Sequence, residues 1–243
     1  MKDYKYENGI LSKEIYVRSI DVNRHKILKT SRLFDYFQDI AFDHVNILGC
    51  GSDRTIDRGI LWVLASQQVK INRMPRYEET IILKTWPAGF RMGFFTRNYA
   101  IETTDGEFLV ESASIWGLIN ASTRELVKPE DYGIVVEPVT VEGAMKSKGG
   151  PKPIDFTSSS DFVIPFSYID VNGHLNNARY LDIIDDTIPA ASQGLEPHLI
   201  NARYATETLE GETIRIDWGC EDNSYYVSID SGDINHFKLR IDY

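Results

Sequence analysis

A short string occurs twice in this chain, and the predicted elements around it repeat in the same order. Residues 20–25 and 169–174 both read Ile-Asp-Val-Asn-x-His, 149 positions apart. In both places a pattern typical of a helix follows the string, and runs of β-branched and aromatic residues typical of strands follow the helix. A chance match of six residues would not carry its flanking elements along. The repeat therefore predicts two copies of one structural unit.

Apolar spacing places one helix in each copy. Apolar residues recur at helical intervals over residues 30–48, where Thr30 or Ser31 is expected to cap the start. A second helical pattern covers residues 176–188 and is expected to stop at Pro189, because proline cannot continue a helix. Each copy is therefore predicted to contain one main helix.

Strand patterns follow each helix. Residues 60–120 read as an antiparallel meander with a hairpin turn at Asp105-Gly106, a dipeptide favoured in type I′ turns. Residues 79–81 and 212–214 both read Glu-Thr-Ile, which gives the repeat a further point of registration. The sequence thus predicts an α+β fold in which each unit wraps an antiparallel sheet around a long helix.

The pattern dissolves between residues 129 and 160, where Pro, Gly, Ser and Lys dominate. We therefore predict an N-terminal unit over residues 1–135, a linker over 136–160 and a C-terminal unit over 161–243. Two such sheets could join edge to edge, which would protect their open strands.

Composition excludes several classes of protein. The formal net charge of −10 argues against nucleic acid as a partner, because phosphate binding needs a concentrated basic face. Cys50 and Cys220 lack zinc-site spacing and are expected to be free thiols. The N-terminal sequence has no apolar segment typical of a signal peptide, and no apolar run is long enough to span a membrane. We expect a cytoplasmic protein without metal or cofactor.

The second copy of the string carries three polar groups that could act on a carbonyl compound. Asp170, Asn172 and His174 alternate, so their side chains would share one face of an extended segment. Asn176 and Asn177 follow where a helix begins, and unpaired N–H groups at a helix start can stabilise an oxyanion. The same residue types also favour Asx turns and helix caps, so a purely structural role stays open. A calcium loop is excluded, because its twelfth position would need a bidentate Glu.

The Glu-Thr-Ile register distinguishes the two copies. It places Glu207-Thr208 in the second copy opposite Met74-Pro75 in the first. If Asp, Asn, His and Glu are all needed for catalysis, only the second unit is complete, and the first shapes the substrate site.

The second string and its surroundings resemble a known enzyme family. Residues 170–180 read DVNGHLNNARY, which is similar to the D-x-N-x-H-V-N-N-x-x-Y signature of acyl-acyl carrier protein thioesterases of the plant FatA/FatB type and their bacterial relatives. The resemblance covers nearly the whole chain. It implies a double hotdog fold and hydrolysis of the thioester between a fatty acyl chain and the phosphopantetheine of its carrier protein.

The resemblance also implies roles for individual residues. It assigns catalysis to Asp170, Asn172, His174 and Glu207. Thr208 stands where plant relatives have a cysteine, so a thiolate nucleophile is not available here and water is the expected nucleophile. The expected substrate-binding residues are Asn176, Asn177, Phe34, Phe37 and Thr208. Core packing is the alternative for the two phenylalanines.

The expected partner is an acyl carrier protein, and a homodimer is left open. Basic residues that could meet an acidic carrier are Lys26, Lys29, Arg32, Arg91, Arg97, Lys146, Lys148 and Lys152. Three other functions compete with this hypothesis. They are a hotdog acyl-CoA thioesterase, a dehydratase acting on a hydroxyacyl thioester, and a non-catalytic acyl-chain binding protein.

Overall fold

The computed structural model describes residues 4–146, 151 and 154–243. Its first half contains β1 (Tyr4–Glu7), β2 (Ile10–Tyr16), η1 (Ser19–Asp21), α1 (Thr30–Ile47), η2 (Ile56–Arg58), β3 (Ile60–Ile71), β4 (Thr80–Arg91), β5 (Phe94–Thr103), β6 (Phe108–Asn120) and η3 (Pro129–Tyr132). Its second half contains β7 (Ser158–Val163), η4 (Phe166–Tyr168), α2 (Arg179–Thr187), α3 (Pro189–Ser192), β8 (Leu199–Tyr204), β9 (Thr213–Glu221), β10 (Ser224–Ser231) and β11 (Ile234–Asp242).

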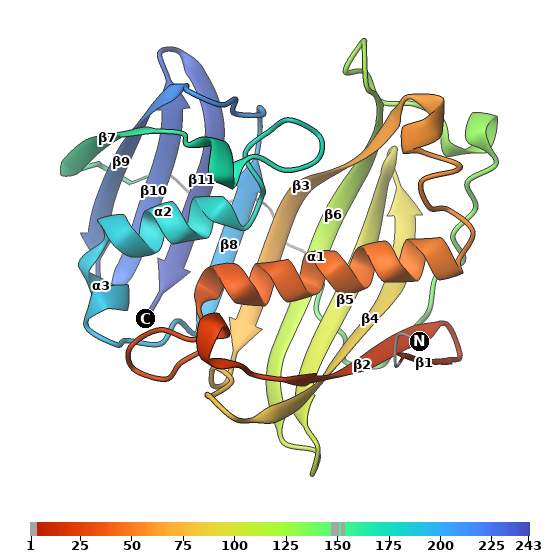
Figure 1. Cartoon of the computed structure of the whole chain (residues 1–243), viewed down its shortest axis with the longest axis horizontal. Helices are drawn as coiled ribbons and strands as arrows, with labels where there is room; N and C mark the ends of the chain where they lie inside the picture. Colours follow the sequence, from red (N-terminus) through yellow and green to blue (C-terminus); the bar gives the residue numbers. More distant parts are fainter. Residues whose placement is uncertain (1–3, 147–150, 152–153) are drawn as a thin grey trace.

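The described strands form one continuous antiparallel sheet in the order β1-β2-β4-β5-β6-β3-β8-β11-β10-β9-β7. The two halves meet where β3 pairs with β8, in a register that runs from Ser66 opposite Arg203 to Lys70 opposite Leu199. Both main helices lie on the same face of this sheet, α1 over the first half and α2 over the second (Figure 1). The edge-to-edge joining expected from the sequence is therefore present.

Helix α1 forms where the apolar spacing places it, but it begins differently. Phe37 and Ile40 are among the residues that its apolar face buries against the sheet. The N-cap is Lys29, and neither expected capping hydroxyl makes a side-chain cap bond, so that expectation is wrong. Gly49 adopts a left-handed φ of +70° just after the end, as helix termini often do.

The hairpin between β5 and β6 is present, but its turn is not the expected type I′. Gly106 has a φ of +93° while Asp105 does not adopt a positive φ. The Thr103 N–H instead donates across a wider loop to the Glu107 carbonyl at 2.9 Å. Both central residues are left-handed, as type I′ demands, at Met92-Gly93, with φ values of +53° and +85°.

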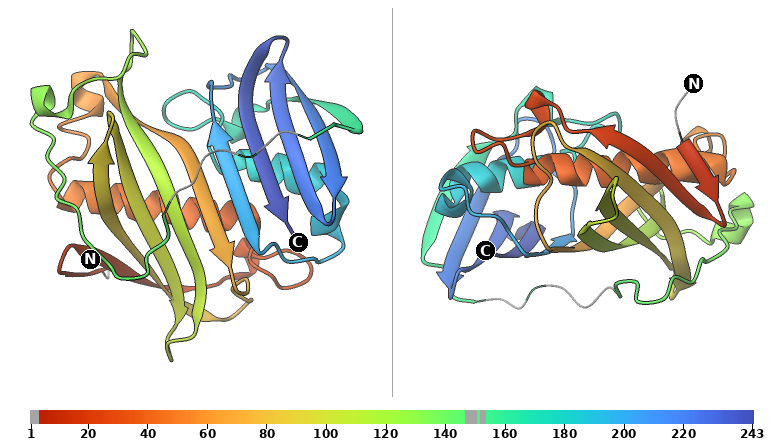
Figure 2. Two further views of the ribbon diagram at one scale, coloured as in Figure 1. Left: turned by 180° about the vertical axis from the view of Figure 1, so that it is seen from behind. Right: turned by 90° about the horizontal axis from the view of Figure 1, so that it is seen from below.

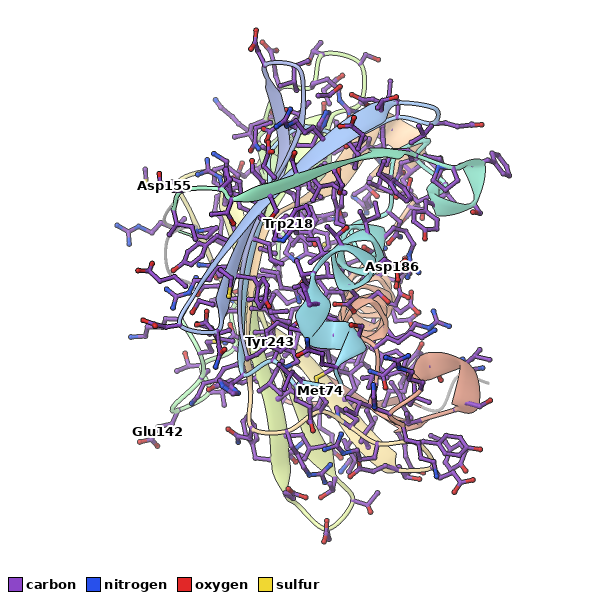
Figure 3. The ribbon with its side chains drawn as sticks, turned by 90° about the vertical axis from the view of Figure 1, so that its left-hand side faces the viewer. Met74, Glu142, Asp155, Asp186, Trp218 and Tyr243 are labelled. Carbon is purple, nitrogen blue, oxygen red and sulfur yellow. The ribbon has the colours of Figure 1, made fainter. Side chains whose placement is uncertain are left out.

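The described parts of the connection between the halves, up to residue 146 and from residue 154, lie on the face of the sheet opposite the helices (Figure 2). Glu142 and Asp155 of this connection lie on one side of the sheet, and Asp186 of α2 lies on the other (Figure 3). The Thr157 N–H donates to the Trp218 carbonyl at 2.9 Å, so the connection runs close to β9 before β7 begins. The described parts of the connection therefore do not cover the face that carries the helices.

Arg97, one of the basic residues expected to meet a carrier protein, is buried. Its guanidinium is 6% exposed and donates to Nδ1 of His44 at 2.9 Å and to Oγ1 of Thr85 at 3.2 Å. Burial and the charge of Arg97 lower the pKa of His44 to about 3, so this imidazole is neutral. Arg97 therefore cannot contact a docked protein. Arg91 is exposed, whereas Lys148 and Lys152 lie outside the described residues.

The structure also corrects the register of the repeat. The Leu28 N–H donates to the Pro75 carbonyl at 2.9 Å, and the Leu175 N–H donates to the Thr208 carbonyl at 2.9 Å. The donors of these two equivalent bonds, Leu28 and Leu175, are 147 positions apart, whereas the two strings are 149 positions apart. The Ile-Asp-Val-Asn-x-His string therefore stands two residues further along the second turn than along the first.

Candidate functional site

The segment with the predicted catalytic residues is a compact turn rather than an extended strand. The Asp170 N–H donates to the His174 carbonyl at 2.8 Å, and the Asp170 side chain folds back over the turn. Its Oδ1 accepts the N–H groups of Asn172 at 2.8 Å and of His174 at 3.4 Å, while Oδ2 accepts Nδ2 of Asn172 at 3.3 Å. The Asx turn that the sequence offered as a structural explanation is therefore present. It also brings Asp170, Asn172 and His174 close together.

Glu207 approaches this turn from the end of β8. Its Oε2 lies 3.2 Å from Nε2 of His174. His236 of β11 supports the backbone at residues 206 and 207. Its Nδ1 lies 3.2 Å from the Thr206 carbonyl oxygen and 3.1 Å from that of Glu207. Because a carbonyl oxygen only accepts, this nitrogen carries a proton. Glu207, which the Glu-Thr-Ile register singled out, therefore lies next to His174 of the repeated string.

A cation from the first half completes the cluster. Arg124, in the turn that follows β6, forms an ion pair with Oε2 of Glu207. Burial, followed by the charge of Arg124, lowers the pKa of His174, and the nearby Asp170 opposes this shift. His174 is therefore neutral at pH 7 and can donate from one ring nitrogen and accept at the other.

These groups line a cavity of about 440 Å³ at the junction of the two halves. Asp170, Asn172, His174, Asn177 and Glu207 contribute to its wall from the second half. The first half contributes residues 61–65 of β3, Ile119 of β6 and Arg124. The cavity is large enough to admit part of a small organic ligand.

The two asparagines after the turn shape the start of α2. Oδ1 of Asn176 accepts the Ala178 N–H at 2.9 Å. Nδ2 of Asn177 donates to Oε1 of Gln38 on α1 at 3.3 Å, and the Asn177 carbonyl accepts the hydroxyl of Tyr204 at 3.1 Å. Asn177 lines the cavity, whereas Asn176 closes an Asx turn just before α2 and does not line the cavity.

Besides Asn176, three further residues expected to bind substrate lie outside the cavity wall. Thr208 is fully buried, and its hydroxyl is 2.6 Å from that of Tyr180. Phe34 is 3% exposed and Phe37 is fully buried, and both belong to the main hydrophobic core. In this structure they pack against protein, and β3 supplies the apolar wall in their place.

Sequence reasoning missed Arg124, Tyr204 and the supporting role of His236. Arg124 follows Ser-Thr in an ordinary polar turn, and no motif distinguishes it from other surface arginines. His236 stands alone in the sequence, without a motif around it that would mark a role. Its contact with the carbonyl of residue 207 depends on how β11 pairs with β8.

Within the described ranges, no three His, Cys, Asp or Glu side chains are placed to hold a metal ion. None of the helices in the described part of the chain has the length and apolar character that crossing a membrane requires.

Two family models match this chain. Residues 10–133 match the acyl-ACP thioesterase N-terminal domain, and residues 152–239 match the acyl-ACP thioesterase C-terminal domain. The first match alone covers more than half of the chain.

Several curated relatives with significant similarity are plant proteins. A chloroplastic acyl-[acyl-carrier-protein] hydrolase of Cuphea viscosissima is 27% identical over 218 residues, which cover 83% of this chain and 53% of the relative. A chloroplastic dodecanoyl-[acyl-carrier-protein] hydrolase of Cinnamomum camphora is 26% identical over 209 residues, covering 78% of this chain and 54% of the relative. The chain therefore spans about half the length of the curated relatives it matches.

Solved structures share the whole fold. An acyl-ACP thioesterase from Bacteroides thetaiotaomicron aligns with a TM-score of 0.83 and 23% identity, covering 96% of this chain and 97% of that one. The 12:0-ACP thioesterase of Umbellularia californica aligns with a TM-score of 0.82 and 17% identity, covering 98% of each chain. The predicted α+β double hotdog fold is confirmed.

Proposed function

The chain belongs to the acyl-ACP thioesterase family, and from that premise we propose that it hydrolyses the thioester of fatty acyl-acyl carrier protein and releases a free fatty acid. The observation that carries this proposal is the contact of Glu207 with His174, 3.2 Å apart, beside a cavity bounded by both halves. A carboxylate and a neutral imidazole at one cavity wall are the groups that water-mediated acyl transfer requires.

Glu207 is the proposed general base. Glu207 approaches Arg124 and His174 most closely through Oε2, and we assign to Oε1 the role of taking a proton from a water molecule. The oxygen of that water forms a bond to the thioester carbonyl carbon, and the C–S bond then breaks. The proton that Glu207 took passes through His174 to the departing sulfur, which restores the Glu207 carboxylate and the neutral imidazole. A thiol with a pKa of about 8.5 needs little help in leaving.

The developing oxyanion needs donors at the start of α2. Within the described residues the Asn177 N–H has no hydrogen-bond acceptor, and its side chain lines the cavity. The Asn172 amide lies at the same wall. We assign these two groups to the oxyanion, because helix-start N–H groups carry partial positive charge.

Asp170 fits less well than Glu207 as the general base, and Thr208 fits less well than water as the nucleophile. Asp170 uses both carboxylate oxygens within its own turn, which favours a positioning role over that of a base. The Thr208 hydroxyl is buried against Tyr180, which leaves water as the better nucleophile.

An acyl carrier protein as partner and a cytoplasmic location belong to this proposal, and a homodimer is left open. The competing functions predict different outcomes with the same protein. An acyl-CoA thioesterase would release acid preferentially from acyl-CoA, a dehydratase would turn over hydroxyacyl thioesters without releasing acid, and a binding protein would retain lipid without turnover.

The test is a ladder of acyl-carrier thioesters and matched acyl-CoA thioesters, with released fatty acid measured for the parent and for Glu207→Gln. We expect acid from the carrier substrates and a loss of about a hundredfold or more in kcat for the variant, the scale of a general base. Glu210→Gln, an exposed neighbour, is the matched control.

Two results would refute the proposal. One is the absence of acid release from every carrier substrate. The other concerns the site, which is wrong if Glu207→Gln and Asp170→Asn both hydrolyse at the parent rate.

A further inference from the structure

Arg124 is a residue of the first half that stands inside the site of the second half. Its guanidinium pairs with the same oxygen of Glu207 that contacts His174. Among the described residues that line the cavity, it is the one charged group supplied by the first half. An exposed arginine paired only for solubility would have no reason to lie at this wall.

The turn that carries Arg124 is tightly held. Oδ1 of Asn120 accepts the N–H groups of Ser122 at 2.8 Å and of Thr123 at 3.0 Å. Arg124 itself has a φ of +60°, and its Nη1 donates to the Ala121 carbonyl at 3.3 Å. A left-handed conformation costs a non-glycine residue roughly 1 kcal/mol, so the surrounding bonds must maintain it.

The sheet fixes this turn relative to Glu207. Asn120 at the end of β6 pairs with Ile60 of β3, and β3 pairs with β8, which leads directly to Glu207. Arg124 and Glu207 therefore lie in short segments that directly follow two strands, β6 and β8, of one hydrogen-bonded sheet. Their ion pair joins the two halves at the place where the chemistry is proposed.

We propose that Arg124 is a positioning residue for thioester hydrolysis: its ion pair holds the Glu207 carboxylate oriented against His174, so that the first half completes the catalytic centre of the second. This inference rests on the proposed function and goes beyond it. It also gives a chemical reason for the two halves to share one sheet, in addition to the protection of strand edges.

The charges around His174 give this role a measurable signature. Three charged groups face the imidazole: Glu207 from the end of β8, Asp170 from its own turn and Arg124 from the first half. The positive charge of Arg124 disfavours the imidazolium form. Removing the Arg124 charge raises the pKa of His174. The imidazolium that then forms pairs with Glu207, so the proposed base is no longer available at a pH where the parent is active.

The experiment titrates the His174 imidazole by NMR in the parent, Arg124→Gln and Arg124→Lys, with the resonance assigned by its absence in His174→Ala. We expect an upward pKa shift of about half a unit or more in Arg124→Gln, as removal of a nearby like charge should give, and a smaller shift in Arg124→Lys. Arg58→Gln, an exposed arginine in η2, is the matched control. This readout needs no substrate, so it is independent of the proposed activity.

Kinetics supply the second readout. Arg124→Gln should lower kcat by about tenfold or more with little change in KM, and it should move the acid limb of the kcat/KM profile to higher pH. In a Glu207→Gln background it should cause no further loss, because the two residues act as a unit. An increase in KM alone, with the His174 titration unmoved, would make Arg124 a carrier contact and overturn the inference. If the parent releases no acid while the NMR shift appears, the proposed function fails and the positioning of His174 stands.

Discussion

The turn at residues 21–30 and the turn at residues 168–177 have the same backbone and different chemistry. Oδ1 of Asn23 accepts the N–H groups of His25 at 2.9 Å and of Ile27 at 3.2 Å. In the second turn Oδ1 of Asp170 makes the corresponding pair of bonds. Lys26 and Gly173 occupy the same left-handed position, with φ values of +62° and +82°. One Asx-closed turn is therefore built twice.

Superposing these bonds shows what each turn presents. Ile27 stands in the position of His174, and His25 stands in the position of Asn172. Met74 precedes Pro75 where Glu207 precedes Thr208. The comparison teaches that the turn is a scaffold, and that side chains at two or three positions decide whether it carries reactive groups.

The largest expected effect distinguishes His174 from His25, which share a place in the repeated string but not in the two turns. His174→Ala should lower kcat by about a hundredfold or more, because it removes the group that faces Glu207. His25→Ala should stay within about twofold of the parent, as exposed substitutions usually do. Steady-state hydrolysis of an acyl-carrier thioester measures both. Equal losses in the two variants would restore the functional equivalence of the two histidines.

An intermediate effect is expected from exchanging the residues that close the turns. Asp170→Asn should fold with an unchanged Tm and keep activity within about tenfold, because Asn23 shows that an amide oxygen closes the same turn. Asp170→Ala should lose the turn bonds and destabilise the protein by about 1 kcal/mol. Asn23→Asp is the matched control and should leave activity unchanged. A loss of a hundredfold in Asp170→Asn at unchanged Tm would assign Asp170 a chemical role.

The smallest effect concerns the cavity beside the first turn, of about 690 Å³, where Asp185 of α2 lies. Burial, followed by the charge of Asp182, raises the pKa of Asp185 to about 7. The folded state thus holds a proton that the unfolded chain releases near pH 4, and this contribution to stability is lost as pH rises toward and through 7. Asp185→Asn should therefore raise Tm at pH 8 by about 2–6 °C, with the gain vanishing near pH 4.

Thermal unfolding of the parent and of Asp185→Asn at pH 4, 6 and 8 checks this expectation, with Asp233→Asn, at an exposed position between β10 and β11, as control. A gain that is the same at every pH would mean that the carboxyl group does not titrate in this range.

Much of the fold could be predicted because it follows from local physics. The apolar spacing of α1 and the strand runs of the meander are properties of neighbouring residues, and both appear in the structure. The turn types were less predictable. Asp105-Gly106 has the letters of a type I′ turn, but the side chain of Thr103 bonds within the loop and a wider turn results.

The candidate site was partly within reach of the sequence. The Glu-Thr-Ile register pointed to Glu207, and the structure brings that residue to His174. The same kind of letter matching misjudged the repeat by two residues, because hydrogen bonds, rather than residue identities, define equivalent positions in a turn. Phe34 and Phe37 show the limit of helical spacing, which cannot tell a cavity wall from a packed core.

The sequence by itself determined two helix-bearing units, an antiparallel sheet and the asymmetry between a turn with reactive groups and a turn without them, because these depend on patterns within short stretches. Only the tertiary structure decided that β3 joins β8, that Arg124 reaches Glu207 and that Arg97 is buried. Contacts between residues far apart in the chain are fixed by strand pairing and packing, and no local pattern of side chains records them.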